Sequence, residues 1–440
     1  MTTLESLYEL YLRHPLVTTD SRDCPQGSIF FALKGDTFDG NLFAARALEQ
    51  GCAAAVVDNP EVAVDQRYMV VPSVLEALQQ LAALHRKRWG KTIIQITGTN
   101  GKTTTKELVS AVLSQSHHVL YTQGNLNNHI GVPRTLLRLT GDHDLAVVET
   151  GANHPGEIAF LCSLVHADYG LITNVGRAHL LGFGSFDGVK HTKGELYDDL
   201  SQRGGKIFLN ALDDDLREMA SSRGFQIGQQ AIPYVEARVE SCSPFLCIQW
   251  REDDDEPWHE VKTHLIGAYN IANLRAAITV GLHFGVTPSQ IDQALEAYQP
   301  TNNRSEFRQT EHNRLVVDAY NANPSSMEAA LTAFAFVEGS HKMVILGDMR
   351  ELGAESRKEH LRVLHQLQGM ELEDVWLVGS EFAQALTEKQ AESECGHTKY
   401  RTFENEKQVE DYLSAHPLSG HTILVKGSNG TGLFRLPALL

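Results

Sequence analysis

The chain has 440 residues, of which 42% are hydrophobic and 21% charged, and its 55 acidic and 38 basic residues leave a net charge of −17. This length excludes a single small module and predicts two to four domains, each able to bury its own core. Because no segment approaches the roughly 18 consecutive apolar residues of a membrane-spanning helix, a soluble protein is predicted. The negative charge disfavours nucleic-acid and anionic membrane partners, so an anionic substrate must be held by local groups.

Two further features favour a reducing cytoplasm. The N-terminal segment carries Glu5 and Glu9 where a secretory signal would carry basic residues. Helical spacing there predicts an amphipathic helix that stays on the protein, with the apolar residues Leu4, Leu7, Tyr8 and Tyr11. Neither a disulfide framework nor a zinc site is indicated, because the cysteines are dispersed without a CxxC pair; they are Cys24, Cys52, Cys162, Cys242, Cys247 and Cys395.

Short runs rich in Val, Ile and Leu predict the strands of parallel sheets that are covered on both faces. The runs lie at 93–97, 145–149, 170–174, 206–210, 315–318, 343–348, 375–379 and 422–426. Helical patterns separate the last four, and this βα repetition is typical of a doubly wound fold.

Two changes in the sequence pattern divide the chain into three parts. An amphipathic stretch gives way to the strand at Ile93, and a polar Pro/Asn-rich stretch covers 298–306. We therefore expect domains at 1–88, 89–301 and 302–440. The acidic run 251–260 suggests either a metal site or a solvated loop. We expect the loop, because no nearby strand end would hold its carboxylates in place.

The strongest functional signal is the segment 96–114. A buried strand ends at Thr97, a glycine-bearing turn follows, and a helix begins near Lys102. Backbone amides at such a helix N-terminus can cradle phosphates, with Lys102 reaching the β- and γ-phosphates and Thr103 binding Mg²⁺. The predicted nucleotide loop is Gly98, Thr99, Asn100, Gly101, Lys102, Thr103 and Thr104. The alternative is an ordinary strand-to-helix turn with a surface lysine.

The loop sequence TGTNGKTT resembles that of the Mur ligase family, ATP-dependent amide-forming enzymes of bacterial cell-wall precursor synthesis. The resemblance continues in TTDSR, GSIFFALKG, DGNLF, GNLNNHIGVP, ETGANHPGEI, TNVGRAHL, KGEL, GAYNIAN, DAYNANPSS, LGDMRELG and VKGS. Within the family, GANHPGEI, YNANP and LGDMRELG resemble the members that join D-alanyl-D-alanine to UDP-N-acetylmuramoyl-tripeptide. This implies a small UDP-binding α/β domain, a central doubly wound phosphate-loop domain, and a C-terminal Rossmann-like domain that closes on ATP and binds D-alanyl-D-alanine.

Metal and catalytic candidates follow two predicted strands. Glu149 and His179 lie at the edge where a doubly wound sheet gathers its ligands. Taken alone, Glu149 is equally well explained as a cap or a solvated acid, and His179 as a structural histidine. The resemblance implies that both residues, with Thr103, hold two Mg²⁺ ions and that CO₂ carbamylates Lys193, so that an anion replaces a cation beside the metals. It thereby implies catalytic roles for Lys102, Glu149, His179 and Lys193.

The nucleotide's other contacts are expected in two places. Asn270 and Asn273 lie one helical turn apart and could bind a base edge or cap the helix. The family often has His where this chain has Tyr269. The resemblance assigns the γ-phosphate, ribose and base to the third domain, at Arg304, Asp318, and Tyr320 with Asn321, so that closure of this domain completes the site.

The resemblance also implies contacts to the substrates. The UDP part is expected near Asp20, Ser21 and Arg22, although a three-residue DSR signal is more often a turn. Asn127 is the better candidate of the pair Asn127 and Asn128. D-alanyl-D-alanine is expected at Asp348, Lys426 and Ser428, and Asn429 stands where the family commonly has Arg. His154 and Glu157 are weaker candidates, because Pro155 predicts the first residue of a helix that they would serve.

The predicted protein is thus a monomeric ligase in which ATP phosphorylates the terminal carboxylate of the tripeptide and the amine of D-alanyl-D-alanine attacks the acyl phosphate. Lys102 and two Mg²⁺ ions would neutralise the like charges of carboxylate and triphosphate. The alternatives are another amide ligase of the superfamily, against which YNANP argues, and a nucleotide-dependent switch. A GTPase switch would carry an N-K-x-D motif, which the chain lacks.

Overall fold

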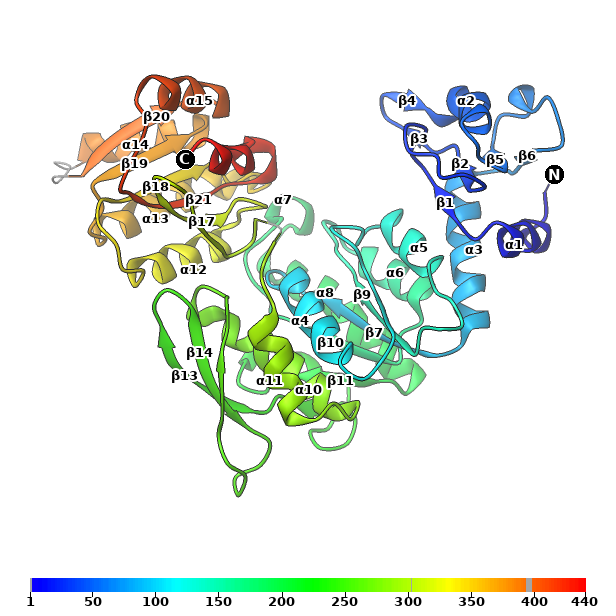
Figure 1. The fold of residues 1–440 in the computed structure, drawn as a ribbon, viewed down its shortest axis with the longest axis horizontal. Helices are drawn as coiled ribbons and strands as arrows, with labels where there is room; N and C mark the ends of the chain where they lie inside the picture. Colours follow the sequence, from blue (N-terminus) through cyan, green and yellow to red (C-terminus); the bar gives the residue numbers. More distant parts are fainter. Residues whose placement is uncertain (1, 302, 393–397) are drawn as a thin grey trace.

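The structure is a computed structural model that describes residues 2–301, 303–392 and 398–440. It is an α/β protein with three parallel or mostly parallel sheets, each carried by a separate part of the chain (Figure 1). We call these parts the first, central and third domains, with strands β1–β6, β7–β15 and β16–β21. In Figure 1 the first and third domains lie above the central one, to the right and left. Cys395 and Asn302, the residue at the expected second boundary, lie outside the described residues.

The first domain is a small sheet of order β1-β2-β5-β6 with all strands parallel. The predicted N-terminal helix is present and buries Leu7, Tyr8 and Tyr11. The elements are α1 (Leu4–Arg13), β1 (Val17–Thr18), β2 (Ile29–Phe31), β3 (Lys34–Gly35), β4 (Phe38–Asp39), η1 (Gly40–Phe43), α2 (Ala44–Glu49), β5 (Ala54–Val57), η2 (Pro60–Val62), β6 (Tyr68–Val70) and α3 (Val74–Trp89).

Helix α3 joins the first domain to the central one. The Ser73 hydroxyl accepts from the Glu76 amide at its start, and Gly90 ends it with a φ of 69°. The helix packs on α1 and on the central helices α5 and α6. Tyr11 strengthens this connection because its hydroxyl donates to the Leu137 carbonyl at 2.6 Å. The first and central domains therefore share one hydrophobic core.

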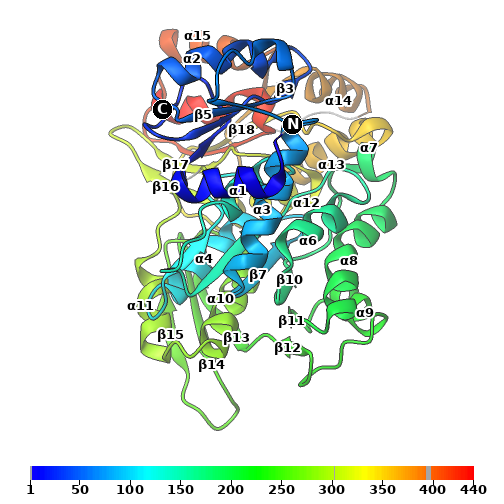
Figure 2. The same cartoon turned by 90° about the vertical axis from the view of Figure 1, so that its right-hand side faces the viewer.

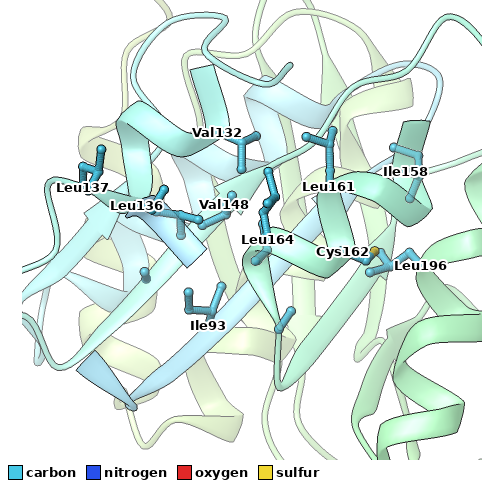
Figure 3. Close-up of a cluster of buried hydrophobic side chains, with 14 of the residues drawn as sticks. Ile93, Val132, Leu136, Leu137, Val148, Ile158, Leu161, Cys162, Leu164 and Leu196 are labelled. Atoms are coloured by element: carbon cyan, nitrogen blue, oxygen red, sulfur yellow. The ribbon is translucent and has the colours of Figure 1, made fainter. Parts of the chain in front are cut away.

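The central sheet has the order β12-β11-β10-β7-β9-β8, and every strand pair is parallel, as the apolar runs predict. Alternate side chains serve opposite faces: Ile93 and Val148 pack toward the first domain, and Ile94 and Val147 toward α4 and α10. Figure 3 shows the first of these clusters. The elements are β7 (Thr92–Thr97), α4 (Lys102–Leu113), β8 (Val119–Tyr121), α5 (Gly131–Leu136), β9 (Leu145–Glu149), α6 (Glu157–Val165), β10 (Tyr169–Ile172), α7 (Leu180–Phe183), α8 (Phe186–Arg203), β11 (Lys206–Leu209), α9 (Asp214–Ser221) and β12 (Ala231–Pro233).

An antiparallel sheet of order β13-β14-β15 extends the central domain, and the sequence runs did not predict it. The acidic run 251–260 lies largely in the loop between β14 and β15, as expected. Helix α6 begins at Glu157 behind Gly156, two residues later than Pro155 predicted. The remaining elements are β13 (Glu236–Cys242), β14 (Leu246–Arg251), β15 (His259–Lys262), η3 (Ala268–Asn270), α10 (Ile271–His283) and α11 (Pro288–Ala297).

The third domain is a sheet of order β16-β17-β21-β18-β19-β20 with helices on both faces. The four predicted strands are parallel, and β16 pairs antiparallel at the edge. The elements are β16 (Glu306–Gln309), β17 (Arg314–Asp318), α12 (Pro324–Ala335), β18 (Lys342–Gly347), η4 (Gly353–Glu355), α13 (Ser356–Gln368), β19 (Asp374–Val378), α14 (Ser380–Glu392), β20 (Lys399–Phe403), α15 (Glu406–Ala415), β21 (Thr422–Lys426), η5 (Asn429–Thr431) and η6 (Leu433–Ala438).

The predicted fold class, three α/β domains around a doubly wound phosphate-loop sheet, is confirmed. Figure 2 shows the central sheet below both other domains, with the antiparallel strands at the far end. Among the described residues, no helix is long and apolar enough to cross a membrane.

Candidate active site

A cavity of about 550 Å³ lies between the central and third domains, at the carboxyl ends of the central strands. This is where a doubly wound sheet gathers its ligands. Predicted residues that line it are Thr99, Asn100, Gly101, Lys102, Thr103, Thr104, Asn127, Asn128, Glu149, Glu157, His179, Asn270, Asn273, Arg304, Asp318, Tyr320, Asn321 and Lys426. Residues from parts of the chain more than 300 positions apart thus share one site.

The phosphate loop is shaped by its two glycines. Gly98 has a φ of 143°, and a Cβ there would lie 2.0 Å from the Thr173 hydroxyl. Gly101 has a φ of 77° and closes on the side chain of Asn273. Both positions require glycine because a side chain would meet its neighbours and because L residues rarely adopt these angles. Helix α4 then begins at Lys102, as predicted.

Lys102 folds back over this loop. Its ammonium donates to the carbonyls of Gly98 at 2.8 Å and Thr99 at 2.9 Å. Burial lowers its pKa to about 8, while the nearby Glu149 carboxylate raises it and Arg304 lowers it further. An anion that enters the cavity would favour the charged ammonium, so the loop is suited to a phosphate.

A hydrogen-bonded chain joins the helix, the strand end and the loop before α5. The Thr103 hydroxyl donates to one oxygen of Glu149 at 2.9 Å, and the Asn127 amide donates to the other at 2.7 Å. Thr103 and Glu149 are almost fully buried. Glu149 is therefore neither a cap nor a solvated acid, and its carboxylate is fixed beside the helix N-terminus.

Lys193 lies on α8 behind the cavity wall, and only 2% of its surface is exposed. Its ammonium contacts the Ala152 carbonyl at 3.5 Å and lies 5.4 Å from the Phe183 ring. Burial lowers its pKa to about 7, Lys102 lowers it further, and Glu195 and Glu157 oppose the shift. This buried amine is thus far more readily neutral than the surface lysine that its sequence context suggests.

The acids near Lys193 are engaged elsewhere. Glu195 accepts from the Gly156 amide at 2.7 Å and the Ala159 amide at 2.8 Å at the start of α6. Glu157 accepts from the backbone of Asn153 and His154. His154 and Glu157 therefore serve the helix N-terminus, which is the simpler of the two alternatives.

His179 follows β10 in the segment before α7 and has a φ of 50°. Its Nδ1 pairs with the carboxylate of Glu351 in the third domain. Burial lowers the pKa of its imidazole, with Glu351 opposing this shift.

The side chains of Asn270 and Asn273 bond to other parts of the protein and do not cap the helix. Asn270 is the N-cap residue of α10, but its side chain makes no capping bond. Instead its amide donates to the Ile266 carbonyl and its oxygen accepts from Asn273 at 2.8 Å. Asn273 in turn accepts from the Thr105 hydroxyl at 3.0 Å, so the pair supports the helix that carries the phosphate loop.

Arg304 is a third-domain residue that lines the cavity. Its guanidinium lies 3.7 Å from the centre of the Tyr320 ring, and its buried Nε has no hydrogen-bond partner among the described residues. Asn303 and Ser305 on either side have φ values of 55° and 49°. A buried, unpartnered guanidinium nitrogen at a cavity wall is suited to an anionic ligand.

Asp318, which is partly exposed, and the buried Lys426 form a pair at the ends of β17 and β21. The Lys426 ammonium lies 2.5 Å from the Asp318 carboxylate and also donates to the Asn321 carbonyl. The structure therefore places Lys426 at the cavity wall beside Asp318, rather than with the other two residues predicted for D-alanyl-D-alanine.

Those two residues lie outside the cavity lining. Asp348 accepts from the amides of Glu381 at 3.1 Å and Phe382 at 2.9 Å, which makes it a cap for α14. The Ser428 hydroxyl accepts from the Arg350 amide and donates to the Ala322 carbonyl. Asn429, where the family commonly has Arg, begins η5 beside them.

The residues predicted for UDP lie on the first domain, away from the cavity. Asp20 pairs with Arg22 at 2.7 Å, and its oxygen also accepts the Arg22 amide, as in a polar turn that includes Ser21.

Asn128, in the central domain, likewise has a local role, because its oxygen accepts from the Ile130 and Gly131 amides at the start of α5.

Sequence reasoning missed several residues that join the domains at this site. The Asn323 amide donates to the Asn100 side chain at 2.8 Å, and the Arg177 amide donates to the Ser325 hydroxyl at 3.1 Å. Asn323 stands in YNANP, but no local signal distinguished it from the helix cap that it also is.

Three family models match this chain. The Mur ligase family catalytic domain matches residues 15–86, the Mur ligase middle domain 96–281, and the Mur ligase glutamate ligase domain 303–429.

Relatives match along most of the chain. The UDP-N-acetylmuramoyl-tripeptide–D-alanyl-D-alanine ligase of Escherichia coli K12 is 35% identical over 95% of this chain and 91% of its own length. The Bacillus subtilis protein of the same name is 35% identical over 77% of this chain and 74% of its own. The crystal structure of MurF from Acinetobacter baumannii has a TM-score of 0.82 and 32% identity, covering 96% of this chain and 92% of that one. The chain belongs to the Mur ligase family.

Proposed function

We propose that this protein joins D-alanyl-D-alanine to UDP-N-acetylmuramoyl-tripeptide with ATP, in the cytoplasmic synthesis of peptidoglycan precursors. Two relatives that bear the name of this ligase match the chain over 91% and 74% of their own length. The observation that carries the proposal is the single cavity shared by the phosphate loop and the third-domain residues Arg304 and Asp318. Residues 1–88 would bind the UDP part through Asp20, Ser21 and Arg22, residues 89–301 the ATP, and residues 302–440 would complete the ATP site and hold the dipeptide.

The nucleotide's phosphates fit the loop and the two cations that face it. The Lys102 ammonium, now bound to loop carbonyls, would turn to the phosphates, and the unpartnered Nε of Arg304 would take the γ-phosphate. Tyr320 and Asn321 would lie near the base and Asp318 near the ribose. In this arrangement Asn270 and Asn273 would support the loop rather than read the base.

The reaction would run in two steps. The tripeptide carboxylate attacks the γ-phosphorus, ADP leaves, and an acyl phosphate forms. The free amine of the dipeptide then attacks the acyl carbon, and the tetrahedral intermediate expels phosphate to leave the amide. Because the first step brings an anion to a polyanion, fixed cations such as Lys102 would supply much of the catalysis. Exclusion of water would protect the acyl phosphate.

The residues around Thr103 fit Mg²⁺ in part. Thr103 and Glu149 offer oxygen donors, and Asn127 fixes the Glu149 carboxylate. No group of three or more His, Cys, Asp or Glu side chains that could hold a metal occurs among the residues described. This suits a cation that keeps waters and substrate phosphates as most of its ligands. When bound, Mg²⁺ would offset the repulsion between carboxylate and triphosphate.

We further propose that Lys193 carries a carbamate and, with Glu149 and His179, helps hold a second Mg²⁺. The neutral amine attacks CO₂, a nitrogen–carbon bond forms, and a proton leaves to solvent. A pKa near 7 keeps much of this amine neutral at physiological pH. The product replaces a cation, which Lys102 repels, with an anion.

A coupled assay tests the proposed function. Purified protein receives ATP, Mg²⁺, D-alanyl-D-alanine and either the diaminopimelate- or the lysine-containing UDP-muramoyl-tripeptide, and the product mass is measured. We expect a product with the added dipeptide and phosphate release that depends on the dipeptide. Phosphate release that is independent of the dipeptide would instead indicate a nucleotide switch.

A further inference from the structure

A carboxylate of the third domain reaches across the domain boundary to the predicted metal ligand His179. Glu351 lies in the loop between β18 and η4, and its side chain pairs with Nδ1 of His179. The connection is doubled, because the Leu181 amide donates to the Glu351 carbonyl at 3.3 Å. Because His179 lines the cavity and pairs with Glu351, this loop lies against the cavity wall.

Both partners have a left-handed backbone. The φ angles are 50° at His179 and 65° at Glu351, values that non-glycine residues rarely adopt. Such conformations persist only where the surroundings impose them, and they cluster at ligand clamps and switch regions. Because His179 and Glu351 face one another and both adopt this conformation, we infer that the contact between the central and third domains is specific.

The third domain holds the Glu351 loop from behind. The Met349 amide donates to Nε2 of the buried His360 at 3.0 Å, and the Arg350 amide donates to the Ser428 hydroxyl at 2.9 Å. The loop thus moves with the third domain, and its carboxylate reaches His179 only when the two domains are docked.

Nδ1 of His179 faces the Glu351 carboxylate, and a carboxylate oxygen accepts a hydrogen bond from a ring N–H. The tautomer with Nδ1 protonated leaves Nε2 as the atom able to bind a metal. Histidines that bind metals ordinarily donate their other ring N–H to a carboxylate or carbonyl, which orients the ring and raises its basicity.

We propose that Glu351 is a positioning residue that orients His179 for metal binding and thereby couples the docking of the third domain to the metal site. The proposal rests on the proposed function, in which His179 holds Mg²⁺. The simpler alternative is a docking contact alone. A hydrogen-bonded pair whose side chains are 28% and 54% exposed contributes little to docking, and in that alternative its loss would not change the metal affinity.

Mn²⁺ titration followed by electron paramagnetic resonance measures the metal affinity directly, without turnover. The full-length protein in bicarbonate buffer would be compared with Glu351→Ala, His179→Ala and the double variant. Arg177→Gln is the matched control, because it removes the neighbouring interdomain pair with Glu359, at 3.4 Å, and leaves His179 intact. Thermal unfolding in metal-free buffer checks that each variant is folded.

We expect Glu351→Ala to weaken Mn²⁺ binding about tenfold or more, which is the usual cost of losing such a carboxylate. The effect should vanish in a His179→Ala background, Arg177→Gln should stay within about twofold of the parent, and Glu351→Gln, which keeps an acceptor oxygen, should recover part of the loss. A smaller loss in Glu351→Ala, with His179→Ala still weakened, overturns this proposal alone. An unchanged affinity in His179→Ala overturns the metal role itself.

Discussion

At the scale of single residues, the proposed electrostatic catalysis depends strongly on the side chain of Lys102. Its ammonium donates to the carbonyls of its own loop, and its position at the N-terminus of α4 brings it to any phosphate held there. Lys102→Ala should lower kcat by about two to three orders of magnitude, the range for one preorganised charge. Steady-state kinetics measure this loss, and circular dichroism should show an unchanged fold. Ligation close to the parent rate would reject the assigned role.

The two interpretations of Lys193, as a free ammonium or as a carbamate, predict opposite effects of the substitution Lys193→Ala. A free ammonium beside two Mg²⁺ ions would oppose metal binding, so Lys193→Ala would be harmless or helpful. A carbamate contributes an anion, so we expect Lys193→Ala to lose most activity. Acetate should restore part of it by entering the space left by the side chain, whereas chloride at equal ionic strength should not. Full activity of Lys193→Ala without added acid would contradict the carbamate.

At the scale of single elements, the contacts of Asp348 at the start of α14 raise the question of whether this residue caps a helix or binds a substrate. Asp348 accepts two amides at the start of α14, which is sufficient to explain its burial. Asp348→Ala should therefore lower the free energy of unfolding by about 0.5–2 kcal/mol, as measured by urea denaturation.

Asp348→Asn separates the cap from a contact to the dipeptide. Asparagine keeps one of the two oxygens that accept the Glu381 and Phe382 amides and removes the charge, so a pure cap predicts a partial loss of stability and an unchanged KM for D-alanyl-D-alanine. A severalfold rise of that KM in folded Asp348→Asn would instead support the contact to D-alanyl-D-alanine that the sequence resemblance implies.

At the scale of the whole molecule, the three domains make unequal contacts. The first and central domains share a hydrophobic core around α3, whereas the central and third domains meet through polar pairs such as Asn100 with Asn323 together with apolar contacts such as Phe245 with Phe307. Interfaces of this kind permit domain motion. We expect small-angle scattering to show a smaller radius of gyration with a non-hydrolysable ATP analogue and UDP-substrate together than without ligands. An identical radius in both states would count against closure.

Features confined to a short window of the chain were determined by the sequence itself. The apolar runs at β7, β9 and β21 became parallel strands within a residue of their predicted bounds, and α4 begins at Lys102, because hydrophobic period and turn glycines act locally. Edge strands such as β8 and β16 escaped prediction, because β8 has only three residues and β16 consists mostly of polar residues.

Only the tertiary structure decided which distant residues meet. The pairs Asn100–Asn323 and His179–Glu351 are separated by 223 and 172 positions. The engagement of Asp348 with α14, and of Lys426 with Asp318, likewise depends on how strands and domains pack. The physical reason is that a polar side chain has the same local signature whether it caps a helix or faces a ligand. The difference arises from the burial and the partners that packing supplies.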